Sequence, residues 1–137
     1  KTDTKVYLSD YAHHPAEICQ SARSIRELYE GRKVTAIFQP HLYSRTLDFY
    51  REFAESLSLF DEVILTDIYP AREEPIPGVT SALIYDNLAP QVKKMMIARS
   101  EVPTIVEAKK NDLDILVTLG AGDIENYAQE ITHILKS

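Results

Sequence analysis

Short apolar runs alternate with longer amphipathic segments along the chain, and this alternation constrains the fold more than any other feature. The apolar runs expected to form strands are 6–8, 34–38, 63–66, 95–97 and 115–119. Each is followed by apolar side chains at helical spacing. Strands that are apolar throughout are covered on both faces, as in a parallel sheet between helices. The sequence therefore predicts an α/β, three-layer, Rossmann-like domain whose mostly parallel sheet of about five or six strands is flanked by helices.

The predicted helices have recognisable starts and ends. Pro15 suits a first helical turn, where its missing N–H has no partner to lose, and Gly31 suits a helix end. Ser100 is the candidate cap of a later helix. The apolar faces expected to be buried include Leu28 and Leu47. We expect helices at 15–30, 46–60, 80–88, 101–110 and 124–135.

Length and composition place these elements in one domain. A chain of 137 residues, 45% of them hydrophobic, can build one core, and no repeat or long linker marks a second. The net charge of −6 argues against a protein that holds nucleic acid by neutralising many phosphates. A small anionic ligand remains compatible with an acidic domain, because a cationic pocket can be local.

The sequence also indicates a compartment. No apolar run approaches the roughly 18 residues of a membrane span, and residues 1–4 lack the hydrophobic stretch of a signal peptide. Cys19 is the only cysteine, so it forms no internal disulfide, and we interpret it as a small buried residue. We therefore expect a cytoplasmic protein that contacts neither a membrane nor nucleic acid.

Two polar loops follow the first two predicted strands. They span 10–15 and 39–45, and they hold three of the four histidines and Arg45. Loops at the carboxyl ends of parallel strands gather at one edge of the sheet, where α/β proteins bind ligands. We therefore expect both loops to face one crevice with a polar site.

The residue types in these loops suit an anion better than a metal. His13 and His14 are adjacent, so in an extended segment they point in opposite directions, although His41 could join one of them. No further ligand stands at a spacing typical of zinc, so we expect no metal held by protein side chains. Histidines that titrate near neutral pH suit an anionic ligand, and the guanidinium of Arg45 suits a carboxylate. The alternative for Arg45 is a solvated charge at a helix start.

A third polar loop, 120–123, follows the strand at 115–119. Its two glycines would let backbone amides approach a ligand, but Glu125 replaces the third glycine of a dinucleotide fingerprint. The residues alone leave two alternatives: a tight turn in which Asp123 caps the last helix, or a contact with a small polar substrate. The sequence has no G-x-x-x-x-G-K-S/T phosphate loop, so the chain has no triphosphate cradle of its own.

Two further strand ends carry carboxylates. Asp10 and Asp67 could each accept hydrogen bonds from ribose hydroxyls, or cap the next turn, which is the commoner role. The segment 67–78 contains three prolines and a glycine, which predict a rigid, irregular loop. Its charged residues 72–74 either form an exposed surface or cover a ligand.

Four of these segments together resemble a known family. They read DYAHHP at 10–15, FQPHLYSRT at 38–46, DIYPAREEPIPGV at 67–79 and LGAGDI at 119–124. In this order and spacing they resemble the C-terminal domain of the ATP-dependent Mur ligases, specifically the family of UDP-N-acetylmuramate–L-alanine ligases. The resemblance covers nearly the whole chain and implies that residues 1–137 are one domain of a longer three-domain enzyme. The domains that hold the UDP-sugar and carry the P-loop would be absent here.

The resemblance also implies an activity and site residues. The full-length enzyme would use ATP and Mg²⁺ to join L-alanine to UDP-N-acetylmuramate through an acyl phosphate, in peptidoglycan precursor synthesis. This domain alone would hold no cofactor and be inactive. Asp10 and Tyr11 would contact the ATP nucleoside, and His13 would be the catalytic residue near the reacting carboxylate or phosphate. The implied substrate-binding residues are His41, Arg45, Gly120, Ala121, Gly122 and Asp123.

Two departures from the family pattern and three alternatives accompany this interpretation. Leu42 stands where many members carry an arginine, so Arg45 or another domain must compensate, and Ser9 stands where an aspartate is frequent. One alternative is the related ligase that attaches a preformed murein tripeptide to UDP-N-acetylmuramate, although the 39–45 loop favours the alanine enzyme. Another is a non-catalytic module that binds a nucleotide or an amino acid. A structural interaction domain would leave the clustered histidines unexplained.

Overall fold

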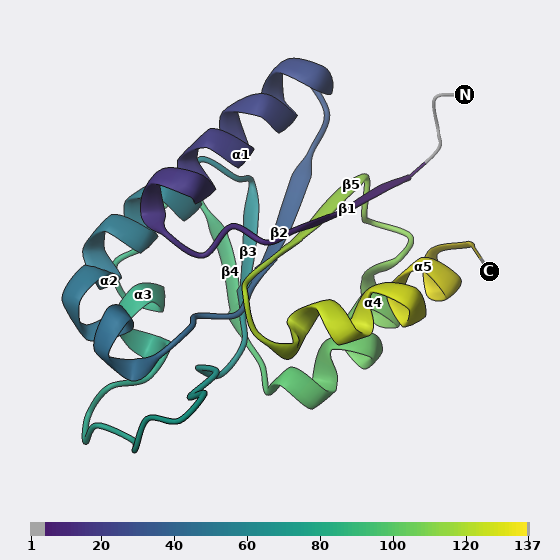
Figure 1. Cartoon of the computed structure of the whole chain (residues 1–137). Coiled ribbons are helices and arrows are strands. Elements are labelled where there is room, and N and C mark those ends of the chain that lie inside the picture. The colour runs from purple at the N-terminus through teal and green to yellow at the C-terminus, as the bar shows by residue number, and fades with distance from the viewer. Residues whose placement is uncertain (1–4, 137) are drawn as a thin grey trace.

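The computed structural model describes residues 5–136, which form one parallel sheet of five strands (Figure 1). Neighbouring strands are parallel throughout, in the order β1-β5-β2-β3-β4. The strands are β1 (Val6–Asp10), β2 (Val34–Phe38), β3 (Glu62–Leu65), β4 (Lys93–Met96) and β5 (Ile115–Leu119). The predicted α/β class with five strands is confirmed. The prediction about a signal peptide rests on residues 1–4, which lie outside the described residues.

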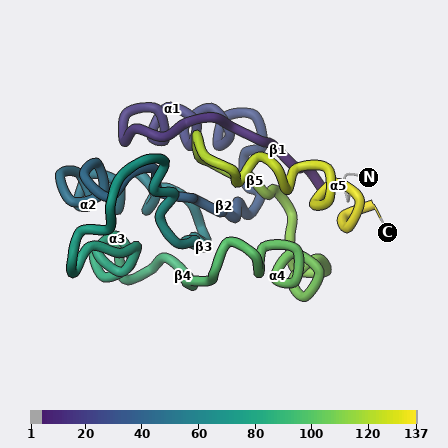
Figure 2. The backbone as a smooth tube through the Cα atoms, turned by 60° about the horizontal axis from the view of Figure 1, so that its bottom comes forward, coloured from purple at the N-terminus to yellow at the C-terminus, as the bar shows by residue number. Residues whose placement is uncertain are grey.

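Helices cover both faces of the sheet, and this explains the apolar central strands (Figure 2). One face carries α1 (Pro15–Leu28), α2 (Tyr43–Leu57) and the short α3 (Ala82–Tyr85), and the other carries α4 (Val102–Lys109) and α5 (Ala128–Lys136). Alternate residues of β2 serve the two faces: Phe38 packs against Phe53 of α2, whereas Ile37 joins the core beneath α4 and α5. No helix between residues 5 and 136 is long and apolar enough to cross a membrane.

The helix boundaries differ from the predicted ones. α2 begins at Tyr43 rather than at residue 46, so Arg45 lies in its first turn. The last helical segment begins as a 3-10 turn, η2 (Asp123–Tyr127), and becomes α-helical at Ala128. Ser100 lies inside another 3-10 turn, η1 (Arg99–Glu101), and does not cap α4. Hydrophobic periodicity predicts which face of a helix is buried. It does not predict where a helix begins or whether its first turn is a 3-10 turn.

Three residues expected in the core are not buried. Leu28, the last residue of α1, is 74% exposed, and Leu47 is 44% exposed. In the first turns of α2, before the non-helical φ/ψ angles at Phe49, the buried residue is Thr46 and not Leu47. Cys19 is only partly buried. The prediction that these three side chains lie in the core was therefore wrong.

The strand order places the polar loops side by side. β5 lies between β1 and β2, so the loop at 120–123 leaves the sheet between the loops that follow β1 and β2. The chain then passes from β1 and β2 to the face of α1 and α2, but from β5 to the face of α5 (Figure 1). Neighbouring connections that leave toward opposite faces open a crevice at the carboxyl edge of the sheet.

Candidate functional site

Three histidines from the first two loops meet at this edge. The ring centroids of His13 and His41 are 5.9 Å apart, and the ring of His14 lies 4.6 Å from that of His13. The two loops therefore share one crevice, as their positions after neighbouring strands predicted. The expectation that His13 and His14 point in opposite directions was wrong, because the segment is irregular and bends at His14 before α1 begins.

Glu17 organises the histidine loop. Its Oε1 accepts the backbone N–H groups of His13 and His14, at 3.0 and 3.1 Å. These hydrogen bonds, first that from His13, lower the pKa of the Glu17 carboxyl below its ordinary value. The Nδ1 of His13 lies 2.9 Å from the carbonyl oxygen of Tyr11, so Nδ1 carries a proton, and the neutral form of this ring has its lone pair on Nε2. A glutamate three residues into a helix is a known capping signal that the sequence analysis missed.

The side chains of His13, His14 and Glu17 are the one group among residues 5–136 that brings three potential metal ligands together. Their ligand atoms lie within 4.8 Å of one another. However, Glu17 Oε1 already accepts two backbone hydrogen bonds, and the Nδ1 of His13 is a donor toward Tyr11. These contacts account for the cluster as the start of α1. That protein side chains hold no metal here stays a prediction.

His41 and Arg45 form a pair on the other side of the crevice. The Nη1 of Arg45 lies 3.3 Å from the Nδ1 of His41. A guanidinium can only donate, so Nδ1 is the acceptor and the ring proton is on Nε2. Partial burial lowers the pKa of His41, and the positive charge of Arg45 and the neighbouring His13 lower it further. His41 is therefore a neutral donor beside a fixed positive charge, a combination that suits a carboxylate.

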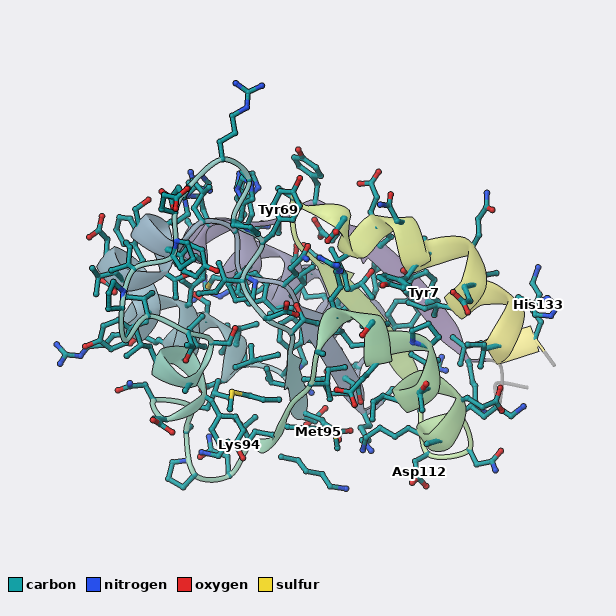
Figure 3. All side chains as sticks on the ribbon, turned by 90° about the horizontal axis from the view of Figure 1, so that it is seen from below. Tyr7, Tyr69, Lys94, Met95, Asp112 and His133 are labelled. Carbon is teal, nitrogen blue, oxygen red and sulfur yellow. The ribbon has the colours of Figure 1, made fainter. Side chains whose placement is uncertain are left out.

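Tyr69, which the sequence analysis did not select, lies against His41. The two rings are stacked with centroids 5.5 Å apart and planes 18° apart. Tyr69 donates its N–H to the carbonyl of Pro40 and accepts the N–H of Leu42, each at 2.8 Å. Figure 3 shows Tyr69 beside the start of the yellow C-terminal helical segment, at this edge of the sheet. The loop after β3 thus supplies a wall of the site.

The glycine loop packs tightly under Tyr69. A Cβ at Gly122 would lie 2.6 Å from the Oε1 of Gln39 and 2.6 Å from the Cγ of Tyr69, so no larger residue fits without a shift. Gly120 has a φ of +151°, which disfavours a side chain there as well. The backbone of the 120–123 loop therefore approaches the crevice closely because two of its residues lack a side chain.

Asp123 does not cap the last helical segment, whereas its contact with a small polar substrate stays a prediction. Gln39, only 1% exposed, donates from Nε2 to the Oδ1 of Asp123 at 2.6 Å and accepts the N–H of Ile124 at 3.0 Å. The Nη1 of Arg99 lies 2.9 Å from Asp123 Oδ2. Asp123 is at the start of η2 but makes no cap hydrogen bond, and both carboxylate oxygens bind partners within the chain. It fixes the glycine loop to the ends of β2 and β4.

Two cavities border the crevice and share Tyr11, whose side chain is 61% exposed. One, of about 320 Å³, lies between Tyr11, Tyr69 and the 121–123 loop. The other, of about 410 Å³, runs along α1 from Asp10 to Ser21. Asp10 accepts the N–H of Ala12 at 2.9 Å through Oδ1 and the hydroxyl of Ser21 through Oδ2. Its carboxylate therefore shapes the loop, whereas Tyr11 is exposed where the two cavities meet.

The fold and the crevice define a class: an α/β domain with a polar crevice at the loops that follow β1, β5 and β2. A family model described as Mur ligase, glutamate ligase domain matches residues 1–122. The chain belongs to this family of Mur ligase domains, as the four sequence motifs predicted.

Two individual relatives are similar to nearly the whole of this chain. A UDP-N-acetylmuramate–L-alanine ligase of Phocaeicola vulgatus is 60% identical to this chain over 98% of its residues, and one of Flavobacterium johnsoniae is 51% identical over the same share. The chain spans 29% of the length of each of these relatives. It is thus similar to one part of enzymes that are more than three times as long.

Solved structures have the same fold. A UDP-N-acetylmuramate–alanine ligase of Thermotoga maritima matches with a TM-score of 0.68 and 24% identity, over 95% of this chain and 26% of that chain. A ligase domain from Haemophilus ducreyi matches with a TM-score of 0.70 and 19% identity, over 97% and 93% of the two chains. At these identities the likeness extends to the arrangement of strands and helices.

Proposed function

We propose that this chain is the amino-acid-binding domain of an ADP-forming ligase that joins L-alanine to UDP-N-acetylmuramate in the cytoplasm. The names of the relatives that are 60% and 51% identical support the activity. The pairing of His41 with Arg45 is the observation that carries the proposal for this domain. It offers a neutral N–H donor and a guanidinium to one carboxylate, which is what an α-amino acid presents next to its reactive amine.

The geometry suggests how the site orients its substrate. Arg45 and the Nε2–H of His41 bind the alanine carboxylate, and the 120–122 loop with Tyr69 bounds the space for the rest of the molecule. The amine then attacks the carbonyl carbon of the muramoyl acyl phosphate, phosphate leaves, and the amine loses a proton. His13 lies across the crevice from His41, and its Nε2 lone pair is a suitable acceptor for that proton.

ATP and Mg²⁺ belong to the longer enzyme in this proposal. The sequence has no phosphate-binding loop, so the triphosphate and its metal ion are held by parts of the enzyme outside this chain. The residues present fit a contact with the nucleoside through the exposed ring of Tyr11, whereas both oxygens of Asp10 already have partners. This chain alone is expected to bind ligands weakly and to catalyse no ligation.

Phosphate release by the full-length ligase tests the proposal. With ATP, Mg²⁺ and UDP-N-acetylmuramate, release should depend on L-alanine and should not occur with a muramyl tripeptide. Glycine and serine are compared in separate reactions, because one methyl group in a pocket is worth only about 1–3 kcal/mol. The substitution Arg45→Ala should raise the KM for alanine about 10- to 100-fold, the range expected for losing a charged hydrogen bond. Arg51→Ala is the matched control, because Arg51 lies on the same helix but packs over Tyr50. Release with only the tripeptide would contradict the proposal.

A further inference from the structure

The side chain of its own N-cap residue does not cap helix α2. Its N-cap residue is Leu42, whose side chain accepts no hydrogen bond, and whose φ of +74° is unusual for a leucine. The first N–H groups of a helix have no partner within the helix, so a cap must come from elsewhere. This helix start carries Arg45, and His41 directly precedes Leu42. A group that holds the start of α2 in place therefore also sets the positions of His41 and Arg45.

Glu73, from the loop after β3, supplies that cap. Its Oε1 accepts the backbone N–H of Ser44 at 3.0 Å, and its Oε2 accepts the Ser44 hydroxyl. The hydrogen bonds from Ser44 lower the pKa of the Glu73 carboxyl below its ordinary value. A carboxylate at a helix N-terminus is also favoured by the helix dipole.

The segment 69–73 is fixed at both of its ends. Backbone hydrogen bonds attach Tyr69 to Pro40 and Leu42, and the Glu73 carboxylate attaches the other end to the first turn of α2. Between them the chain turns back, with Glu73 donating its N–H to Pro70 at 2.8 Å. The ring of Tyr69 lies on His41 within this closed arrangement.

We propose that Glu73 is a positioning residue of the amino-acid site. Its carboxylate caps α2 and thereby holds Tyr69 on His41 and Arg45 against the Nδ1 of His41. The substrate named for the site rests on the proposed function, but the positioning does not. Glu73 touches neither His41 nor Arg45 by a hydrogen bond and acts through the helix start and the 69–73 segment.

The charges that face His41 provide a second way to test the role of Glu73, through the pKa of His41. Arg45, His13 and His14 lower the pKa of His41, and Glu73 acts in the opposite direction. Removing the charge of Glu73 should therefore lower the pKa of His41 further. A residue that only stabilised α2 from a distance would leave this titration unchanged.

The test compares Glu73→Gln, which keeps a hydrogen-bond acceptor but no charge, with Glu73→Ala, which keeps neither. Glu74→Gln is the matched control, because Glu74 is the next residue and is exposed. In the full-length ligase, Glu73→Ala should raise the KM for alanine about fivefold, as expected for a lost cap, with kcat changed less than about twofold. Glu73→Gln should have a smaller effect on KM, and Glu74→Gln none.

NMR of this chain supplies the second readout. In Glu73→Gln the His41 ring should titrate at lower pH than in the unchanged chain, and in Glu73→Ala the ring contact between Tyr69 and His41 should weaken. An unchanged titration together with an unchanged KM would overturn the proposal, even if stability fell. If the full-length ligase does not use alanine, the proposed function fails, while the titration and the ring contact still decide the role of Glu73.

Discussion

Both ends of the sheet carry charged side chains, but at the amino end Glu62 and Asp114 are paired with basic side chains. Glu62, at the start of β3, is 2% exposed and lies 2.7 Å from the Nζ of Lys109 and 3.6 Å from that of Lys33. At the carboxyl end, no carboxylate among residues 5–136 forms an ion pair with Arg45, whose one recorded hydrogen-bond partner is the neutral ring of His41.

A second pair at the amino end follows the same pattern. Arg32 precedes β2 and Asp114 precedes β5, and they join through a guanidinium–carboxylate contact of 2.5 Å. The hydrogen bond from Arg32 lowers the pKa of Asp114. At the carboxyl end, Arg99 and Asp123 pair beneath the glycine loop and belong to its framework. The contrast teaches that residue type alone does not identify a site. Among the partly buried arginines of residues 5–136, Arg45 differs in having a neutral ring, not a carboxylate, as its hydrogen-bond partner.

The largest expected loss of stability comes from removing one partner of a charge pair at the amino end of the sheet. Lys109→Ala would leave the buried Glu62 carboxylate with only the more distant Lys33, and should lower the free energy of unfolding by about 3 kcal/mol. Denaturant unfolding of this chain measures it. Lys110→Ala is the control, because Lys110 pairs with the exposed Glu107, and it should change stability by less than about 0.5 kcal/mol. Equal losses in the two variants would contradict the distinction.

Glu62, at the amino end of the sheet, should also contribute to the loss of stability at low pH. Burial raises the pKa of Glu62, but the hydrogen bond and charge of Lys109, with Lys33, outweigh burial and leave the pKa below 4.5. The stabilisation by this carboxylate is therefore complete above pH 4.5 and is lost as the pH falls through the lower folded-state pKa. Unfolding measured against pH should show a shallower acid loss in Glu62→Gln. An unchanged slope would mean that other carboxylates dominate.

At the carboxyl end, Gly122→Ala should have an intermediate effect. The added methyl would meet Gln39 and Tyr69 at 2.6 Å, so we expect a stability loss of about 1–3 kcal/mol and displacement of Tyr69 from His41. Gly31→Ala is the control, since Gly31 also resists a side chain, through its φ of +81°, but has no atom within 4 Å of an added Cβ. Ring contacts in NMR spectra should change only in Gly122→Ala.

The smallest effect concerns the protonation of His41. Its pKa lies below 6.5, because of burial first and Arg45 second, so the neutral ring should be the more populated form at pH 6.5 in this chain. Arg45→Ala removes a positive neighbour and should raise the midpoint of the ring titration toward 6.5. NMR titration of the His41 ring protons measures the midpoint in the unchanged chain and in Arg45→Ala. A midpoint that fell in Arg45→Ala would show that the guanidinium does not face the ring as described.

Local patterns predicted the fold and the place of the site, but not the contacts that build it. The apolar runs identified all five strands, and the position of the loops after β1 and β2 brought His13 and His41 to one crevice. Tyr69, Glu73 and the partners of Asp123 were not identified as parts of the site. The paired residues lie 24 to 84 positions apart, and such pairs leave no periodic signal in one sequence.

Arg45→Ala and Lys109→Ala, unfolded side by side in this chain, test the central claim that the carboxyl-end arginine serves a ligand while the amino-end charges hold the fold. Lys109→Ala should lose about 3 kcal/mol, and Arg45→Ala less than about 0.5 kcal/mol. That result would show that the fold does not need Arg45, as a ligand-binding role requires. A loss in Arg45→Ala as large as that in Lys109→Ala would make Arg45 a structural residue and contradict the account.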